Sequence, residues 1–191
     1  QEGRFFHGYY NCYCYLPLYV FCGEHLLAAK LRRSNIDASA GATEEVARIV
    51  SRIRARWPRV KILLRADSGF AREALMAWCE ANRVDFLFGL ARNARLVDHI
   101  HIDLAWAEDE AERTGRPSRR FADFRWRTLD SWSRKRRVVA KAEWMPRRGE
   151  AGANLRFVVT SLPATEVGAR ALYERLYCAR GDMENRIKEC Q

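Results

Sequence analysis

The sequence contains no apolar run long enough to cross a bilayer, because charged residues interrupt every hydrophobic stretch. This pattern excludes a transmembrane helix. The chain does not begin with methionine, and its first residues lack the basic and then apolar pattern of a secretory leader. We therefore expect a piece of a soluble, cytoplasmic protein. Internal repeats and low-complexity tracts are also missing, and an apolar content of 48% over 191 residues excludes a disordered chain.

Cysteine and histidine are too few and too unevenly spaced to indicate a metal site or a nucleophile. The six cysteines form no CxxC pair, and without a leader they do not suggest a disulfide framework. Cys12, Cys14 and Cys22 share the parity of one strand face near His25. A zinc site is conceivable there, but packing in the core is the favoured interpretation. The four histidines show no catalytic spacing and are interpreted as structural or surface residues.

Positive charge is concentrated in one segment. Residues 113–148 hold 13 basic and three acidic side chains, whereas the rest of the chain balances 21 against 21, so this segment carries the whole net charge of +10. A solvated basic face is the ordinary explanation of such a run. Here aromatic residues are interleaved with the charges, which favours contact with nucleic acid. The aromatic residues are Phe121, Phe124, Trp126, Trp132 and Trp144.

Hydrophobic periodicity predicts an α/β domain. Thr43 is the expected N-cap of a first helix, and Phe70, Ala74, Leu75 and Trp78 are the expected buried stripe of a second. Helix and strand alternate from the first of these helices onward, which is typical of parallel strand pairing. The predicted strands are residues 9–21, 25–32, 60–65, 84–90 and 155–162, of which the first two form a hairpin. The predicted helices are residues 43–57, 70–82, 94–112 and 165–191.

The basic segment is predicted to form a small β-rich insertion in this domain. Apolar and polar residues alternate around Phe121–Trp126, and a loop with proline and glycine follows at residues 146–154. The expected division of the chain is a core over residues 1–112, a basic insertion over residues 113–150, and a return to the core over residues 151–191.

Asp67 is the first candidate for chemistry, since it follows a predicted buried strand and precedes Ser68 and Gly69. In α/β sheets, functional residues gather at the carboxyl ends of strands. An aspartate at this place can bind a metal ion while the glycine lets the backbone turn. Asp67 or Ser68 can equally be the cap of the following helix, and position alone does not separate the two interpretations.

The last predicted helix carries the second candidate. Tyr177, Arg180, Glu184 and Lys188 follow one another at spacings of three, four and four, so they share one helical face. That face can bind a metal ion through Glu184 and DNA phosphates through its cations. A solvated salt-bridge ladder explains the same pattern and is favoured when the helix is considered by itself.

Four segments carry motifs that are specific in combination, ADSGF and YxxRGxxEN among them. The segments are HGYYNCYCYLPLYVFCGEHLLAAKLR, LLRADSGFAREALMAWCE, VDFLFGLARNARL and LYCARGDMENRIKE. Together they resemble the DDE transposases of bacterial insertion sequences, and more narrowly the subgroup with a β-rich insertion before the catalytic glutamate. The resemblance covers essentially the whole chain and implies a ribonuclease-H-like mixed sheet flanked by helices. By resemblance, Asp67 is the second catalytic aspartate, Glu184 is the catalytic glutamate, and Tyr177 and Arg180 belong to the signature around that glutamate.

Two positions depart from the family pattern. The family's first catalytic aspartate lies on a strand ahead of Gln1, and the lysine of the signature would fall at Gln191. Lys188, one helical turn after Glu184, is the candidate substitute for that lysine. The resemblance therefore implies a fragment that has two of three catalytic carboxylates and lacks the family's C-terminal portion, and we expect this fragment not to cut DNA.

The resemblance implies metal-dependent phosphoryl transfer on DNA. The carboxylates would hold two divalent cations, Mg²⁺ or Mn²⁺, since oxygen ligands suit these ions. Water would release a 3′-hydroxyl group at a transposon end, and this hydroxyl would attack target DNA in an assembly that is at least a dimer. The alternatives are a non-catalytic transposase remnant that binds DNA and a metal-dependent nuclease of the same fold.

Contacts with DNA are expected in two places. Tyr177, Arg180 and Lys188 would steady phosphates beside the catalytic glutamate. The basic insertion would hold more of the duplex. Trp126 and Trp132 are candidates for stacking on a flipped base, as in related transposases, or they fill the core of the insertion. The basic residues expected to contact phosphates are Arg134, Lys135, Arg136 and Arg137.

Overall fold

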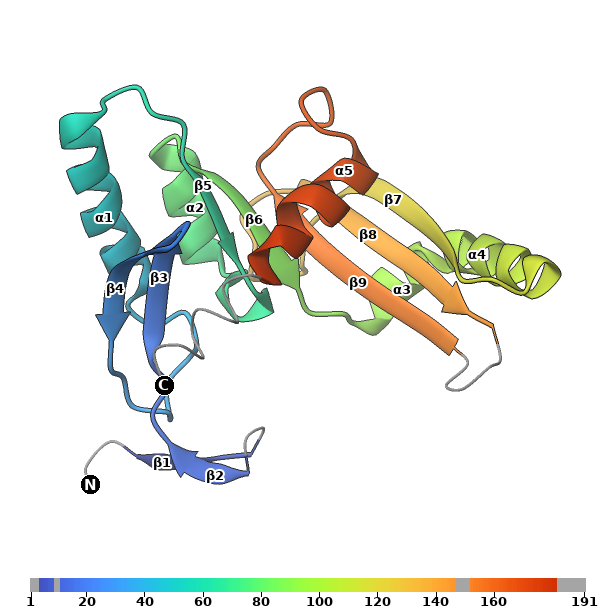
Figure 1. Ribbon diagram of the computed structural model, residues 1–191, viewed down its shortest axis with the longest axis horizontal. Helices are drawn as coiled ribbons and strands as arrows, with labels where there is room; N and C mark the ends of the chain where they lie inside the picture. The colour runs from blue at the N-terminus through green and yellow to red at the C-terminus, as the bar shows by residue number, and fades with distance from the viewer. Residues whose placement is uncertain (1–3, 9–10, 147–151, 182–191) are drawn as a thin grey trace. The chain divides into compact units, whose positions relative to one another are not determined.

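The computed structural model describes residues 4–8, 11–146 and 152–181. The chain divides into two units, with one boundary between Lys61 and Ile62 and another after Arg180. The first unit contains two hairpins and a helix. The second contains a five-stranded sheet with its helices, and it carries Asp67 (Figure 1).

The first unit begins with two short antiparallel hairpins where the sequence predicted a single one. β1 pairs with β2, and β3 pairs with β4. Pro17 lies between β2 and β3, and proline interrupts a strand because it has no amide hydrogen to donate. Gly23 makes the turn of the second hairpin at a φ of 58°, a left-handed value that favours glycine. The strands are β1 Phe5–His7, β2 Cys12–Cys14, β3 Leu18–Cys22 and β4 His25–Lys30.

Helix α1, Ala42–Arg56, completes the first unit. Its N-cap is Gly41 at a φ of 72°, so the prediction that Thr43 caps the helix is wrong. The apolar residues at helical spacing that predict this helix are Val46, Ile49, Val50, Ile53 and Trp57. The last of them fails as a core residue, because Trp57 stands at the C-cap, where the backbone leaves the helix, and is exposed. The fully buried members of the stripe are Val46, Ile49 and Val50.

The second unit is built on one mixed sheet with the strand order β5-β6-β9-β8-β7 (Figure 1). The strands β5 and β6 are parallel, as predicted, and the remaining neighbours are antiparallel. β7 and β8 extend this sheet, because β9 continues past β6 and pairs with β8 along its whole length. The basic segment therefore adds strands to the main sheet, and the domain boundaries proposed from the sequence remain a prediction. The strands are β5 Leu63–Ala66, β6 Asp85–Leu90, β7 Ser118–Trp126, β8 Arg136–Met145 and β9 Gly152–Thr160.

Helices cover both faces of this sheet. α2, α3 and α4 lie on one face, where the rings of His99 and Phe124 meet with centroids 4.2 Å apart. The last helical segment covers the other face and is the red ribbon that crosses in front of β8 and β9 in Figure 1. The helices of the first face are α2 Glu73–Ala81, α3 Ala94–His99 and α4 His101–Thr114. The last segment consists of α5 Ala169–Ala171, the π-helical turn η2 Leu172–Tyr177 and the 3₁₀ turn η3 Cys178–Arg180.

The buried stripe of α2 differs from the predicted one. A 3₁₀ turn, η1 Ser68–Phe70, precedes α2, so the helix begins at Glu73 rather than directly after Gly69. This later start changes which side chains face the sheet, and Ala74 is exposed. The residues of α2 that are buried are Leu75, Met76 and Cys79.

An apolar contact seats the last helical segment on the sheet. Leu172 and Tyr173 are buried against Leu87, Val139 and Val158, which come from three neighbouring strands. Hydrophobic burial is non-directional, but the side chains that point to one sheet face determine where the segment can lie. The contact carries the chain across the sheet toward the end of β5.

Replacing Leu172 with alanine is expected to lower the free energy of unfolding by about 3 kcal/mol, because it leaves a cavity in a fully buried site. Urea unfolding followed by circular dichroism measures this loss. Leu129→Ala is the matched control, since Leu129 is 67% exposed and its truncation should cost less than about 0.5 kcal/mol. Equal losses in the two variants would contradict the assigned core.

Candidate active site

Asp67 directly follows β5 and begins the short turn η1. Its Oδ1 accepts a hydrogen bond from the backbone N–H of Gly69 at 2.8 Å, so the capping role left open by the sequence is present. The side chain is exposed. The hydrogen bond engages one oxygen, and a carboxylate has a second oxygen with which to bind a cation. Capping and metal binding are therefore compatible at Asp67.

The hydroxyl group of Tyr177 lies beside the turn that Asp67 begins. A Cβ atom placed on Gly89 of β6 would be 2.6 Å from Tyr177 Oη, 2.9 Å from Ser68 N and 3.2 Å from the backbone C of Asp67. These three atoms therefore surround one point above Gly89. Two residues predicted to belong to the site, Asp67 and Tyr177, are brought together from distant parts of the sequence.

Arg65 of β5 is hydrogen-bonded to the same helical segment. Its Nη1 donates a hydrogen bond to the carbonyl oxygen of Leu176 at 2.9 Å. The backbone of Arg180 closes the turn η3, while Glu184 and Lys188 lie outside the described residues, as does the side chain of Arg180. The approach of Glu184 to Asp67 therefore stays a prediction.

Among the residues that the structure describes, Asp67 is the candidate metal ligand. Within residues 4–8, 11–146 and 152–181, no three histidine, cysteine, aspartate or glutamate side chains gather to hold a metal ion. The predicted partner, Glu184, would add a second carboxylate. Carboxylate oxygens are the donors that Mg²⁺ and Mn²⁺ prefer, so the donor chemistry fits these ions.

The cysteines of the described chain form no zinc cluster. Cys79 is buried in α2, and burial raises the pKa of its thiol to about 12, so it remains an uncharged core side chain. Cys12 and Cys22 are exposed. Packing in the core is therefore the wrong interpretation for those two residues.

Comparison with protein families identifies this domain. A family model described as transposase DDE domain group 1 matches residues 1–191. The chain belongs to this family. Together with the mixed sheet flanked by helices, membership confirms the predicted ribonuclease-H-like fold. A search of curated proteins found no match.

In the part of the chain that the structure describes, no helix is both long enough and apolar enough to cross a membrane. The longest helix among these residues, α1, has arginines in its last turn and glutamates in its first.

Arg136 is a structural residue of the DDE domain. Its side chain is 2% exposed, with Nη1 2.6 Å from Glu73 Oε2 and Nε 2.7 Å from Glu80 Oε1. Both carboxylates belong to α2, outside the segment in which the basic charges were counted. The prediction that Arg136 contacts DNA is corrected, because a buried guanidinium group paired with two carboxylates is not presented to a phosphate.

Arg137 is buried on the opposite face of β8. Its Nη2 lies 2.6 Å from Asp123 Oδ2 on β7, and its Nη1 donates to the carbonyl oxygen of Leu162 at 2.9 Å. Nη2 also donates to the carbonyl oxygen of Val167 at 3.0 Å. Arg137 thus fastens the loop between β9 and α5 to the sheet, and its predicted role in DNA contact is corrected for the same reason as that of Arg136.

Arg134 and Lys135 differ from the two arginines that follow them, because both are exposed. The side chain of Arg134 is 66% exposed, and its Nε lies 3.7 Å from Glu80 Oε2. An exposed ion pair of this length is weak and is readily exchanged for another anion. These two residues are the members of the predicted basic group that can meet a phosphate.

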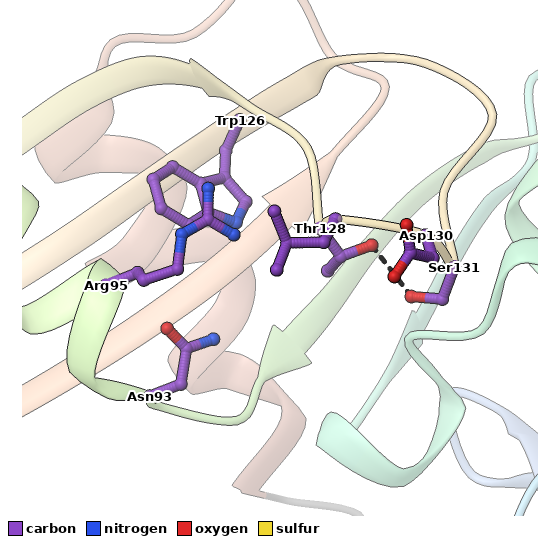
Figure 2. A pocket seen from close by; sticks show the side chains of 7 residues that line it. Asn93, Arg95, Trp126, Thr128, Asp130 and Ser131 are labelled. Atoms are coloured by element: carbon purple, nitrogen blue, oxygen red, sulfur yellow. Dashed lines mark hydrogen bonds between the residues drawn. The ribbon is translucent and has the colours of Figure 1, made fainter.

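Trp126 and Trp132 are both largely buried, with 9% and 4% of their surfaces exposed. The guanidinium carbon of Arg95 lies 4.8 Å from the centre of the Trp126 ring, and that of Arg136 lies 5.7 Å from the centre of the Trp132 ring. Figure 2 shows Arg95 against Trp126 at the edge of a shallow pocket that Asn93 also lines. Their burial favours the role in the core that the sequence left open.

Sequence reasoning missed both the partners of Arg136 and the residues around Asp67. Glu73 and Glu80 lie seven residues apart in α2, which places them on one helical face, and this spacing could have indicated a shared partner. Arg65 and Gly89 carry no comparable signal, because each lies within an apolar strand pattern. Their roles become visible only when the strands and the last helical segment are brought together.

Replacing Arg136 with methionine is expected to lower the free energy of unfolding at pH 7 by about 3 kcal/mol, because two carboxylates lose a buried partner. The hydrogen bond from Arg136 lowers the pKa of Glu73 to about 2. The stabilisation from Glu73 is therefore complete above its ordinary value of 4.5 and is lost as the pH falls toward 2.

Urea unfolding at several pH values from about 2.5 to 7, which cover most of that titration, measures the effect. The difference between the natural protein and the Arg136→Met variant should shrink as the pH falls. Arg134→Met is the control, since its side chain is exposed and its loss should change stability little. A difference that does not depend on pH would contradict the assigned ion pair.

Proposed function

We propose that the transposase to which this DDE domain belongs cleaves DNA strands at the ends of a bacterial insertion sequence and joins them to target DNA, with Mg²⁺ or Mn²⁺ as cofactor. The observation that carries the proposal is the position of Asp67. It stands exposed at the carboxyl end of β5, where the last helical segment brings Tyr177 beside it. Glu184 follows Tyr177 by seven residues in the same motif.

Asp67 and Glu184 would hold the divalent ions. When bound, such ions supply Lewis-acid stabilisation of the charge that builds up on a phosphate during in-line displacement. Asp67 is suited to this task because the hydrogen bond from Gly69 N orients its carboxylate before any ion arrives. No side chain needs to become a covalent nucleophile.

Water and the DNA itself supply the attacking groups. In cleavage, a water oxygen bonds to the phosphorus while the bond to the 3′-oxygen breaks, and the 3′-oxygen takes up a proton. In strand transfer, that 3′-hydroxyl attacks a phosphorus of the target and displaces another 3′-oxygen. Arg180 and Lys188 would neutralise the phosphates beside these centres.

The wider contact with DNA would come from the exposed basic side chains. Arg134 and Lys135 lie in the loop between β7 and β8, and Arg127 in the same loop is also exposed. Each lysine or arginine that meets a phosphate releases a counterion, which makes binding dependent on salt. Since transposition joins two ends, the active assembly would be at least a dimer on DNA.

Replacing Asp67 with asparagine is expected to reduce metal-dependent cleavage about a hundredfold or more, because loss of an outer partner of a metal ligand already costs 10–100-fold. The assay is cleavage of labelled DNA by the natural protein with Mg²⁺ or Mn²⁺. Asp109→Asn, an exposed change on α4, is the control. Cleavage by the Asp67→Asn variant at the natural rate would refute the assignment.

The same assay separates the related functions. Cleavage without joining would identify a nuclease of the same fold, and binding without cleavage would identify a transposase remnant. Cleavage followed by joining to target DNA would support the proposed reaction.

Reversing the charges of Arg134 and Lys135 to glutamate is expected to weaken DNA binding roughly tenfold at low salt. The slope of log Kd against log salt concentration should fall by about two, since two phosphate contacts are lost. Fluorescence anisotropy over a salt series measures both quantities. Arg52→Glu with Arg56→Glu on α1 is the control with the same change in charge, and an equal loss there would contradict the localisation.

A further inference from the structure

Gly89 occupies a place in β6 that has no room for a side chain. Gly89 is buried, and three atoms occupy the space that a Cβ atom on it would need. Two of them, Ser68 N and the carbon of Asp67, belong to the backbone of the turn that presents the Asp67 carboxylate. The third is Tyr177 Oη, at 2.6 Å from that point. The absence of a side chain at Gly89 therefore lets the tyrosine and the Asp67 turn approach each other.

The segment that carries Tyr177 is held in a fixed position along the sheet. Residues Leu172–Tyr177 form a π-helical turn, a rare conformation that is frequent at functional sites. Arg65 donates to the carbonyl oxygen of Leu176 at 2.9 Å, so the strand that ends at Asp67 also binds the end of this turn. The ring centroid of Tyr173 lies 5.6 Å from that of Tyr177 and supports it from the preceding turn. The Tyr177 ring therefore has contacts on several sides.

This arrangement bears on what the hydroxyl group of Tyr177 does. A tyrosine that binds a DNA phosphate must offer its hydroxyl group to solvent. Here Oη lies against Gly89, a buried glycine of β6, and beside the backbone of the Asp67 turn.

We infer that Tyr177 and Gly89 are positioning residues that together set the place of the Asp67 carboxylate, and that Tyr177 acts through this turn rather than on DNA. The inference rests on the proposed role of Asp67 as a metal ligand. Its physical basis is close packing, because the Asp67 turn and the Tyr177 hydroxyl group both lie against Gly89, and a side chain added there would have to displace them. A metal ligand held in place before binding avoids the cost of being ordered by the ion.

The test measures Mn²⁺ binding by the natural protein through the electron paramagnetic resonance signal of free Mn²⁺, which does not depend on catalysis. The variants are Gly89→Ala, Tyr177→Phe and the two combined, with Gly168→Ala as the control because a Cβ at Gly168 meets nothing within 4 Å. DNA affinity is measured in parallel in Ca²⁺, and thermal unfolding without metal confirms that each variant is folded.

We expect Gly89→Ala to weaken Mn²⁺ binding about tenfold, the loss typical of a displaced support for a metal ligand. Tyr177→Phe should weaken it severalfold, roughly threefold, while leaving the DNA Kd unchanged. The combined variant should bind Mn²⁺ more tightly than Gly89→Ala alone, because removing the hydroxyl group opens the tightest of the three contacts. Gly168→Ala should behave as the natural protein does.

Natural Mn²⁺ affinity in a folded Gly89→Ala variant would overturn the inference. So would a Tyr177→Phe variant that loses DNA affinity and keeps its Mn²⁺ affinity, since that result would place the hydroxyl group on DNA. If Gly89→Ala does not fold, the Tyr177→Phe result decides alone. Natural Mn²⁺ affinity in Asp67→Asn would instead refute the proposed metal site, so the two failures are distinguishable.

Discussion

Leu172 and Tyr173 pack against strands β6, β8 and β9, and this apolar contact carries the end of the described chain across one face of the sheet. Everything at the candidate site depends on it. Asp67 follows a strand in the first half of the sequence, and the tyrosine beside it comes from a segment more than a hundred residues later. Hydrogen bonds such as that of Arg65 adjust the final position, but the burial of Leu172 supplies the free energy that brings the two together.

The basic charges of the second unit serve two different purposes. Arg136 and Arg137 are buried, and a buried guanidinium group is tolerated only when carboxylates and carbonyl oxygens replace its water. Glu73, Glu80 and Asp123 provide those partners. Arg134 and Lys135, directly before them in the sequence, remain in solvent. A run of four cations is thus divided at a point where the loop ends and β8 begins.

The division explains why a count of charges overestimated the surface available to DNA. The count treated residues 113–148 as one patch, but a strand alternates its side chains between two faces. Arg136 and Arg137 therefore point to opposite sides of the sheet and meet different elements. The carboxylates that neutralise Arg136 lie on α2, far away in the sequence, and no local pattern joins them to it.

Much of the local structure follows from the sequence. The apolar runs around Leu64 and Phe88 predicted two buried parallel strands, and the position of Asp67 at the end of the first was correct, because burial of both faces imposes a continuous apolar pattern. The motifs also indicated the family and its fold. The predicted start of a helix was wrong where a short turn precedes it, as η1 precedes α2.

Tertiary structure alone decided which residues surround Asp67 and which basic side chains reach solvent. Gly89 and Arg65 are ordinary members of apolar strands when the sequence is considered by itself, and the sequence motif that includes Tyr177 does not show that its hydroxyl group lies beside the Asp67 turn. Their relation exists only after β5, β6 and the last helical segment have packed together. Local sequence determines periodicity, because side chains follow the period of their own helix or strand. Contacts between distant segments depend on the three-dimensional path of the backbone. That path decides which carboxylate a buried arginine meets and which atoms fill the space beside a glycine.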